Sequence, residues 1–571
     1  MCGIAGYIDF NQKINNSIKI NKIIDSLKHR GPDKSGYWIS KNKNIFLVNT
    51  RLAIQDLSKN GNQPLLSGDG RYIIVFNGEI YNYKFLKEKL KEFKFKSNSD
   101  TEVLLYMYIK FKVKCLNYLE GMFAFTIYDT REKKLFSARD KFGIKPFYYY
   151  YDKNFFCFSS EIKTMSLMGI KKKHNDKAIL RYLDTEYHEH QYETYYENIF
   201  KIKPGNYMII DQKGRVLKKN YFDVKDRYKS ILIPSNRNEK INLIRELIFK
   251  SVKKSLVSDV PISVAASGGL DSSILQIILK KLGKKIDLIS FVFKEQQFSE
   301  EKYIKEISDK TKFNYRTINI TPNIFKENLK ESIDILEEPF SGLPIISYLL
   351  CIKKLAKTKV ILDGSGLDEA NFGYDKYTNL NSNQNNLEYA QDGSLSVYKN
   401  MIHSNLKKYK ENLSFEKPFK DEFRNNMYAD LNFFKLPRAL KFRDKLGMKF
   451  GKEIRPCFLD EELIFTLLKL DYQYHYKNGF SKRILRDAFK EDLSKKIAFA
   501  KKRNIQTPQT FWLRGELSSW LKKFFNKSEI WDLNWINKEE FFKNLRLFEK
   551  KKINNSFFIW KIINLELWRK I

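Results

Sequence analysis

The pattern of apolar residues changes near residue 240, and this change divides the chain into two kinds of structure. Before it, short β-like runs accompany two helix-like segments, 84–93 and 101–111, which predicts a layered α+β domain. After it, long helical patterns separate short buried strands, as is typical of a parallel sheet covered by helices. The predicted strands are 44–50, 72–81, 123–129, 147–152, 155–160 and 206–211 in the first part, and 261–266, 287–293 and 359–364 in the second.

A polar segment lies between the two parts. The turn Lys203-Pro204-Gly205 precedes the last strand-like run of the first part, and residues 223–238 are mostly polar. At 571 residues the chain is too long for one ordinary core. We therefore predict domains at 1–213 and 239–571 joined by a linker at 214–238, with a mostly helical C-terminal part from about Leu436.

The composition of the chain indicates its cellular location and the kinds of cysteine and histidine site to expect. No apolar stretch approaches the length of a membrane span and no signal segment opens the chain, so we expect a cytoplasmic protein with no membrane partner. Five scattered cysteines without a CxxC pair argue against a disulfide framework and against a thiolate zinc site. His188 and His190 form a close pair, but without companion ligands we interpret them as part of a polar loop.

The formal net charge of +37 raises the question of nucleic acid. Lysines are spread along the whole chain, and the longest clusters, 171–173 and 550–552, are short. A compositional bias explains this distribution better than a binding stripe, so we predict no nucleic-acid partner. A basic surface still attracts anionic small molecules such as nucleotides.

The first six residues, MCGIAG, place a cysteine behind the initiator methionine. Removal of Met1 would leave Cys2 with a free α-amine beside its thiol, an amine-activated nucleophile; an inert buried thiol is the alternative. Polar clusters follow at strand ends: HRGPD (29–33), RLAIQDL (51–57), FNGEIYN (76–82), SDTEVLL (99–105) and ARDKFGIKPFYY (138–149). In order and spacing, over roughly the first 160 residues, they resemble the class II glutamine amidotransferases, which are N-terminal nucleophile hydrolases with an αββα sandwich.

The resemblance implies a role for each residue that matches the family pattern. Cys2 would attack the side-chain amide of glutamine and form a thioester, while Asn77 and the Gly78 N–H hold the oxyanion. Arg51 would bind the substrate carboxylate and Asp100 its ammonium group. Glu79 and Ala53 would line the glutamine pocket.

The second part contains VAASGGLDSSILQ (264–276), a Ser/Gly turn between a predicted strand and a helix. Backbone N–H groups at such a turn form an anion cradle, and no GK[ST] follows, so this is not a Walker A loop. The alternative is a generic glycine-rich turn. SGGxDS resembles the pyrophosphate loop of ATP pyrophosphatases, which implies ATP binding by Ala266, Ser267, Gly268, Gly269, Asp271 and Ser272.

Two later segments extend the resemblance to the glutamine-hydrolysing asparagine synthetase family. ILDGSGLDEANFGYDKY (361–377) resembles SGEGxDE…GY, and 436–460 resembles the block that ends in PFLD. The resemblance implies that Asp271 and Asp368 share Mg²⁺ and that ammonia crosses an internal tunnel to an aspartyl adenylate. It also implies nucleotide contacts from Phe293, Asp363 and Gly364, and an adenylate and acceptor site with Ser365, Asp368, Glu369 and Lys502.

The chain departs from the family pattern at the acceptor end. The acidic residue of SGEG is Ser365, its serine is Asp363, and PFLD has become CFLD at 457–460. The segment 501–508 keeps Lys502 only if it is registered on Pro508, and a shift of one residue would substitute Arg503. Three interpretations stay open: an aspartate-amidating enzyme, an amidotransferase for another carboxylate such as a sugar uronic acid, and an RNA-binding or RNA-modifying protein. We predict small-molecule partners (glutamine, ATP and aspartate or another carboxylate), with a homodimer as the candidate assembly.

Overall fold

The structure is a computed structural model that describes residues 2–11, 14, 17–184, 192–340, 342–355, 358–374, 376–377, 396–411, 414–500 and 507–571. Over these residues, no helix combines the length and the apolar character that crossing a bilayer requires.

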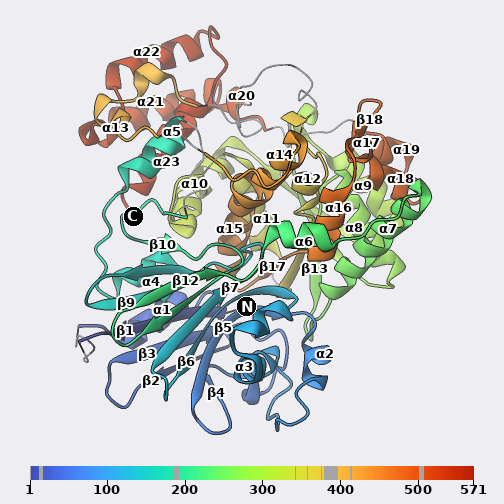
Figure 1. Cartoon of the computed structure of the whole chain (residues 1–571). Helices are drawn as coiled ribbons and strands as arrows, with labels where there is room; N and C mark the ends of the chain where they lie inside the picture. Colours follow the sequence, from blue (N-terminus) through green and yellow to red (C-terminus); the bar gives the residue numbers. More distant parts are fainter. Residues whose placement is uncertain are drawn as a thin grey trace.

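The N-terminal part is built on two six-stranded antiparallel sheets (Figure 1). The first has the order β10-β8-β9-β1-β3-β2 and the second β12-β11-β7-β6-β5-β4. Their strands are β1 Cys2–Asp9, β2 Lys34–Ile39, β3 Ile45–Arg51, β4 Leu65–Leu66, β5 Tyr72–Ile80, β6 Gly121–Asp129, β7 Lys134–Arg139, β8 Tyr148–Tyr151, β9 Phe155–Ser159, β10 Phe200–Lys201, β11 Asn206–Asp211 and β12 Val216–Asn220.

Successive side chains of a strand point to opposite faces of the sheet, so each sheet packs against the other sheet on one face and against helices on the other. Ile4 and Ile8 of β1 pack between the two sheets, whereas Ala5 and Tyr7 point to the opposite face. That outer face is covered by α1 (Ile20–Leu27) and α4 (Ile162–Ser166). The outer face of the second sheet is covered by α2 (Tyr83–Glu88) and α3 (Asp100–Phe111). The layers agree with the predicted α+β sandwich, and the strands that we predicted in this part are present.

The C-terminal part contains a five-stranded parallel sheet of order β15-β14-β13-β16-β17. Its predicted strands are confirmed as β13 Ile262–Ala265, β14 Asp287–Phe293 and β16 Val360–Asp363, and two more complete it: β15 Asn314–Ile320 and β17 Glu453–Pro456. Because all five run the same way, their carboxyl ends meet at one edge, where open parallel sheets bind ligands. The sheet packs against α7 Arg237–Lys254, α8 Leu270–Lys281, α9 Glu301–Thr311, α10 Pro322–Leu336, α11 Pro344–Lys354 and α15 Lys435–Met448.

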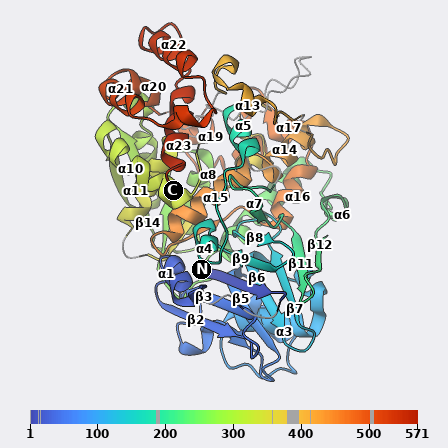
Figure 2. The ribbon, with the colours of Figure 1, turned by 90° about the vertical axis from the view of Figure 1, so that its left-hand side faces the viewer.

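The predicted linker, 214–238, contains β12, which joins the second sheet, and α6 (Val224–Ser230). The remaining helices of the described chain include α5 Asp176–Asp184, α12 Leu367–Ala370, α13 Ser404–Lys407, α14 Glu422–Asn432, α16 Glu461–Lys469, α17 Tyr472–His475, α18 Arg483–Phe489, α19 Lys495–Ala498, α20 Gln509–Arg514, α21 Ser518–Asn526, α22 Lys538–Glu549 and α23 Phe557–Trp568, and a hairpin pairs β18 Tyr476–Lys477 with β19 Phe480–Ser481. In both views the C-terminal helices α20–α22 lie farthest from the sandwich (Figures 1 and 2).

Candidate functional site

Cys2 begins β1 and lies in the interior, with 6% of its surface exposed. Its backbone N–H donates to Asn77 Oδ1 at 3.1 Å. Burial raises the pKa of the Cys2 thiol, and the positive chain terminus lowers it less. A thiol in this setting is not a thiolate at neutral pH, so it needs a base at close range to act as a nucleophile.

Asn77 and Gly78 lie on β5, the neighbour of the edge strand β4, and β5 is buried along its whole length. The Asn77 side chain is fully buried, and its Nδ2 has no hydrogen-bond partner among the residues that the structure describes. A side chain on Gly78 would collide with the backbone of β6, 2.2 Å from the Met122 carbonyl oxygen. The close strand pairing therefore explains the glycine, and the buried Asn77 amide is a donor that awaits an acceptor.

Arg51, the last residue of β3 and the register partner of Cys2, is bound to its own following loop. Its Nη1 donates to the Ser58 carbonyl at 2.8 Å and to Asn62 Oδ1 at 2.9 Å, and its Nη2 donates to the carbonyls of Gln55 and Asp56. The guanidinium thus shapes the loop 55–62 beside the thiol. The Ala53 N–H donates to Asp33 Oδ2 at 2.8 Å on the same side.

Two buried carboxyl groups complete this site. Glu79 accepts a hydrogen bond from Gln55 and pairs with Arg455 of β17 at 3.4 Å, so a residue of the C-terminal part reaches the N-terminal site. Burial, and then Glu453, raise the pKa of Glu79 well above its usual value. Asp100 accepts from the Ile80 N–H at 2.9 Å, and burial raises its pKa to about 6. Both groups are suited to a ligand that brings a positive charge or a donor.

Sequence reasoning missed Asn49, which lies at this site in the middle of β3. Its Nδ2 donates to Gln63 Oε1 at 3.2 Å and to the Phe76 carbonyl at 3.4 Å, and its side chain lowers the pKa of the Cys2 thiol against the larger effect of burial. A polar residue within the apolar run IFLVNT was the available signal, since buried amides in a strand need partners.

A second site lies at the carboxyl edge of the parallel sheet, where β13 leads into α8. The loop is closed by its own serines: the Ser267 N–H donates to Ser272 Oγ at 2.9 Å, and the Gly269 N–H donates to Ser267 Oγ at 3.3 Å. The Gly268 N–H donates to Glu300 Oε2 at 3.3 Å. These side-chain oxygens accept hydrogen bonds from the loop N–H groups that could otherwise bind an anion. Sequence reasoning missed Glu300.

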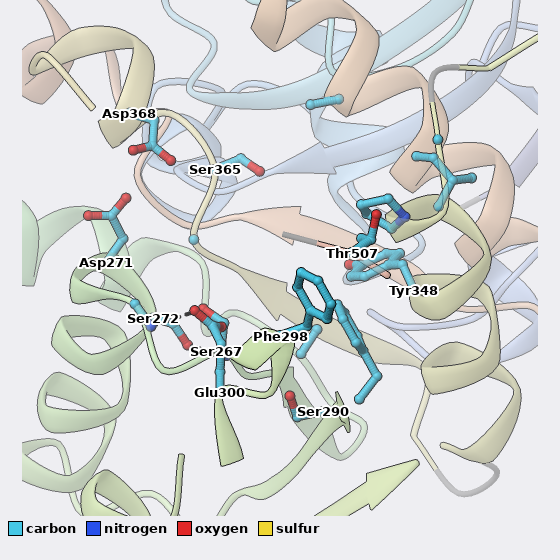
Figure 3. Close-up of a pocket in the computed structure, with 18 of the residues that line it drawn as sticks. Ser267, Asp271, Ser272, Ser290, Phe298, Glu300, Tyr348, Ser365, Asp368 and Thr507 are labelled. Atoms are coloured by element: carbon cyan, nitrogen blue, oxygen red, sulfur yellow. Dashed lines mark hydrogen bonds between the residues drawn. The ribbon is translucent and has the colours of Figure 1, made fainter. Parts of the chain in front are cut away.

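The Asp271 and Asp368 side chains turn toward the same space, with the serines of the loop beside them (Figure 3). Between them lies Lys482, whose Nζ is 2.5 Å from Asp271 Oδ2 and 2.6 Å from Asp368 Oδ1. Two carboxylates that share one cation could also share a divalent ion once phosphate oxygens supply further ligands. No group of three or more His, Cys, Asp or Glu that could hold a metal alone occurs among the described residues. Sequence reasoning missed Lys482.

Asp363, at the end of β16, is the centre of a third cluster. Its Oδ1 accepts from the Ser365 N–H at 2.9 Å and from the Ser365 hydroxyl, and its Oδ2 accepts from Arg443 Nε at 2.8 Å. The Tyr348 hydroxyl lies 3.5 Å from the same oxygen. The carboxylate and hydroxyl that replace the serine and acid of the family motif therefore form one hydrogen-bonded unit held by an arginine.

The loop, the carboxylates and the Asp363 cluster line one cavity of about 1270 Å³. Ala266, Gly364 and Glu369 also reach it, and burial followed by the Asp368 charge raises the pKa of Glu369 to about 7. Phe293 is not brought to it: its ring packs in the core against Trp512 at 5.8 Å, while Ser290 and Phe291 of the same strand line the wall. Lys502, Arg503 and the pair His188 and His190 lie outside the described residues.

Comparison with known proteins defines the class that combines these two sites. Residues 1–222 match the glutamine amidotransferase domain family, and residues 243–570 match the asparagine synthase family. Glutamine-hydrolyzing asparagine synthetase 1 of Bacillus subtilis is 27% identical over 621 residues, covering 100% of this chain and 97% of the relative. Asparagine synthetase 3 of the same organism is 27% identical and covers 91% and 89%. Amidase chry2 of Gibberella zeae is 25% identical and covers 94% and 93%.

The chain therefore belongs to the asparagine synthase family, and the resemblance proposed from the motifs is confirmed. It is an ATP-dependent ligase of the asparagine synthase (glutamine-hydrolysing) type with an amidotransferase domain at its N-terminus.

Proposed function

We propose that Cys2 releases ammonia from glutamine at the first site and that this ammonia is joined to an acyl adenylate formed at the second. The observation that carries the proposal is the side chain of Asn77. Its Oδ1 holds the Cys2 nitrogen, and its buried Nδ2 has no partner among the described residues. This is the arrangement expected of an oxyanion donor in the fold of an N-terminal nucleophile hydrolase.

In the first half-reaction, the α-amine exposed by loss of Met1 takes the proton of the Cys2 thiol, and sulfur attacks the glutamine amide carbon. Asn77 Nδ2 and the Gly78 N–H stabilise the oxyanion, and the amide nitrogen leaves as ammonia with the transferred proton. Water then hydrolyses the thioester to glutamate. Asp100 and Glu79 are the carboxyl groups that bind the substrate ammonium group. Arg51 holds the loop 55–62 in place at the glutamine pocket, and Ala53 lies next to this loop.

In the second half-reaction, a carboxylate oxygen of the acceptor attacks the α-phosphorus of ATP and pyrophosphate leaves. The loop residues Ser267, Gly268, Gly269 and Ser272 form the phosphate cradle, and Lys482 neutralises charge on the leaving group. Asp271 and Asp368 are the residues that would hold Mg²⁺, which supplies electrostatic stabilisation of the phosphates when bound. Ammonia then attacks the acyl carbon and AMP leaves.

Aspartate is the default acceptor, and the Asp363–Ser365 pair favours a second candidate. The carboxylate that accepts a proton from the attacking nitrogen in the family pattern is here a serine hydroxyl that donates to Asp363. A different carboxylate, such as a sugar uronic acid, is the alternative that this exchange supports. No observation on the described residues favours an RNA-binding or RNA-modifying role.

The test separates the two sites. Cys2→Ala should abolish glutamine hydrolysis, while pyrophosphate release with ATP, acceptor and free ammonium continues. The assay is glutamate release together with pyrophosphate release against a panel of carboxylates. Glutaminase activity that survives in Cys2→Ala, or release of ADP and phosphate in place of AMP and pyrophosphate, would contradict the proposal.

A further inference from the structure

Three consecutive residues near the end of α15 contact three different places in the molecule. Arg443 binds Asp363 at the second site, with Nε to Oδ2 at 2.8 Å. Asp444 binds Arg30 of the N-terminal part, with Arg30 Nη2 to Asp444 Oδ2 at 2.9 Å. Lys445 binds Glu337, with Nζ to Oε2 at 2.9 Å. Successive helical side chains point about 100° apart, so one short stretch of helix can reach all three.

Arg30 connects Asp444 to Cys2, the proposed nucleophile. Its Nε donates to the backbone carbonyl of Cys2 at 3.3 Å, and its Nη1 donates to Glu161 at 3.2 Å. The Arg30 side chain is fully buried, and both of its carboxylate partners are 3% exposed. Three edges of one planar guanidinium are thus held by three separate segments, and one of these contacts is the backbone carbonyl of Cys2.

The second carboxylate partner of Arg30 also depends on α15. Glu161 immediately precedes α4, and the first backbone N–H groups of α4, at Ile162 and Lys163, donate to Glu337. Glu337 is the partner of Lys445 on α15. Both anchors of the Arg30 guanidinium are therefore connected to the same helix of the C-terminal part, one directly and one through Glu337.

A buried lysine adds to the charge that Asp444 balances. Lys145 is fully buried, and its Nζ lies 3.9 Å from Asp444 Oδ1 without a hydrogen-bond partner among the described residues. Burial lowers the pKa of Lys145, and the charge of Asp444 opposes this shift. Asp444 is thus the carboxylate that two buried cations of the N-terminal part face.

From these contacts we infer that Asp444 is a positioning residue of the glutaminase reaction, supplied to the N-terminal site by the C-terminal part. It fixes the Arg30 guanidinium, which fixes the Cys2 carbonyl, and so aligns the nucleophile with Asn77. The inference rests on the proposed role of Cys2. Its neighbour Arg443 has the corresponding position toward Asp363 at the second site, so adjacent residues of one helix serve different half-reactions.

The test compares Asp444→Asn with Arg443→Gln in the full-length protein. Asp444→Asn keeps the shape of the side chain and removes its charge, and we expect kcat for glutamine hydrolysis to fall about tenfold or more, since displacement of a reacting group by 1 Å costs up to about 100-fold. The KM for glutamine should stay within about twofold, because the groups that bind glutamine are not touched. Ammonium-dependent pyrophosphate release should be unchanged. Arg443→Gln should show the opposite pattern.

Two further variants keep the inference falsifiable. Asp444→Glu restores the charge and should recover part of the lost kcat, a response that loss of packing alone would not show. If Asp444→Asn does not fold, Arg30→Lys carries the test by the same criteria, because an ammonium cannot replace the three directed N–H groups.

Cys2→Ala separates a failure of the inference from a failure of the proposed function. Glutaminase that survives in Cys2→Ala overturns both. If Cys2→Ala is inactive and Asp444→Asn hydrolyses glutamine at the native kcat, the positioning role alone is overturned. An equal loss of glutaminase and of ammonium-dependent pyrophosphate release in Asp444→Asn also overturns it, because the residue would then support only the interface.

Discussion

Exchanging the residues at positions 363 and 365 tests why the acceptor end departs from the family pattern. In the structure the Ser365 hydroxyl and N–H both donate to Asp363, whose other oxygen accepts from Arg443. The variant Ser365→Glu alone would remove one donor and place a second carboxylate beside the first. The double variant Asp363→Ser with Ser365→Glu would keep a single carboxylate and move it to the family position.

The size of the repulsion in Ser365→Glu follows from the distance between the two carboxylates. Two carboxylates about 4 Å apart at an effective dielectric constant of about 20 repel by roughly 4 kcal/mol, equivalent to about three pKa units. Arg443 offsets only part of this, because its Nε is already bonded to Asp363. The pair in Ser365→Glu would therefore hold a proton at pH 7, and the new group could not accept one from ammonia.

We expect the native enzyme to use aspartate poorly, Ser365→Glu to gain nothing at pH 7, and the double variant to raise aspartate-dependent pyrophosphate release by about tenfold or more. The assay uses ammonium as the nitrogen source, so that the Cys2 site plays no part, and Asp363→Ser is the matched control. A gain by Ser365→Glu equal to that of the double variant at pH 7 would refute the repulsion argument. Asparagine formation by the native enzyme at an ordinary rate, about 1 to 10 per second, would refute the changed acceptor.

Four other outcomes follow from the two sites. Asp271→Asn should lower pyrophosphate release by orders of magnitude and leave glutamine hydrolysis largely intact, measured on the same preparation. Lys482→Met should also lower pyrophosphate release, and unchanged release would remove Lys482 from the phosphate site. The pKa of Glu369 in the folded protein, about 7, lies above its ordinary 4.5, so the protein loses stability as the pH rises through 7 and this buried group becomes charged. Glu369→Gln should therefore raise the free energy of unfolding by up to about 3 kcal/mol at pH 8 and leave it unchanged at pH 4.5. Denaturant titrations at the two pH values measure this difference. Active enzyme should lack Met1 by intact mass, since a retained Met1 would lock the Cys2 amine in a peptide bond.

Strands with strong local signals could be predicted, and those defined by distant partners could not. The runs that became β5, β6, β13, β14 and β16 are apolar and end at turn residues, so local pattern was sufficient. β17 reads EIRP, with a charged residue on either side of one isoleucine. Its two charges are buried only because Arg455 pairs with Glu453 and Glu79. These ion pairs form only through tertiary contacts, so no periodic pattern of apolar residues in the sequence predicts the strand.

The same distinction holds for the candidate sites. Some candidate residues share a motif with a loop or a strand end, and the structure brings Asn77 to Cys2 and places Asp271 and Asp363 at one cavity. Phe293 was predicted to contact adenine, yet the apolar side chains around α20 offer it a partner in Trp512, and the ring packs in the core. Lys482 precedes α18, far from every motif, and nothing in a chain with 104 Lys and Arg residues distinguishes it before folding.

The placement of charge shows why the two parts act as one molecule. Burying an ion pair costs several kcal/mol of desolvation for each ion, and a hydrophobic contact of the same shape would often be more stable. Yet Arg30 with Asp444, and Arg455 with Glu79, cross between the two parts in the interior, next to the Cys2 site. Directed hydrogen bonds fix orientation in a way that apolar packing does not. Arg30 and Arg455 each pair with one carboxylate of their own half, Glu161 and Glu453, and with one carboxylate of the other half. The charged surroundings of Cys2 therefore include residues of α15 and β17 from the second half.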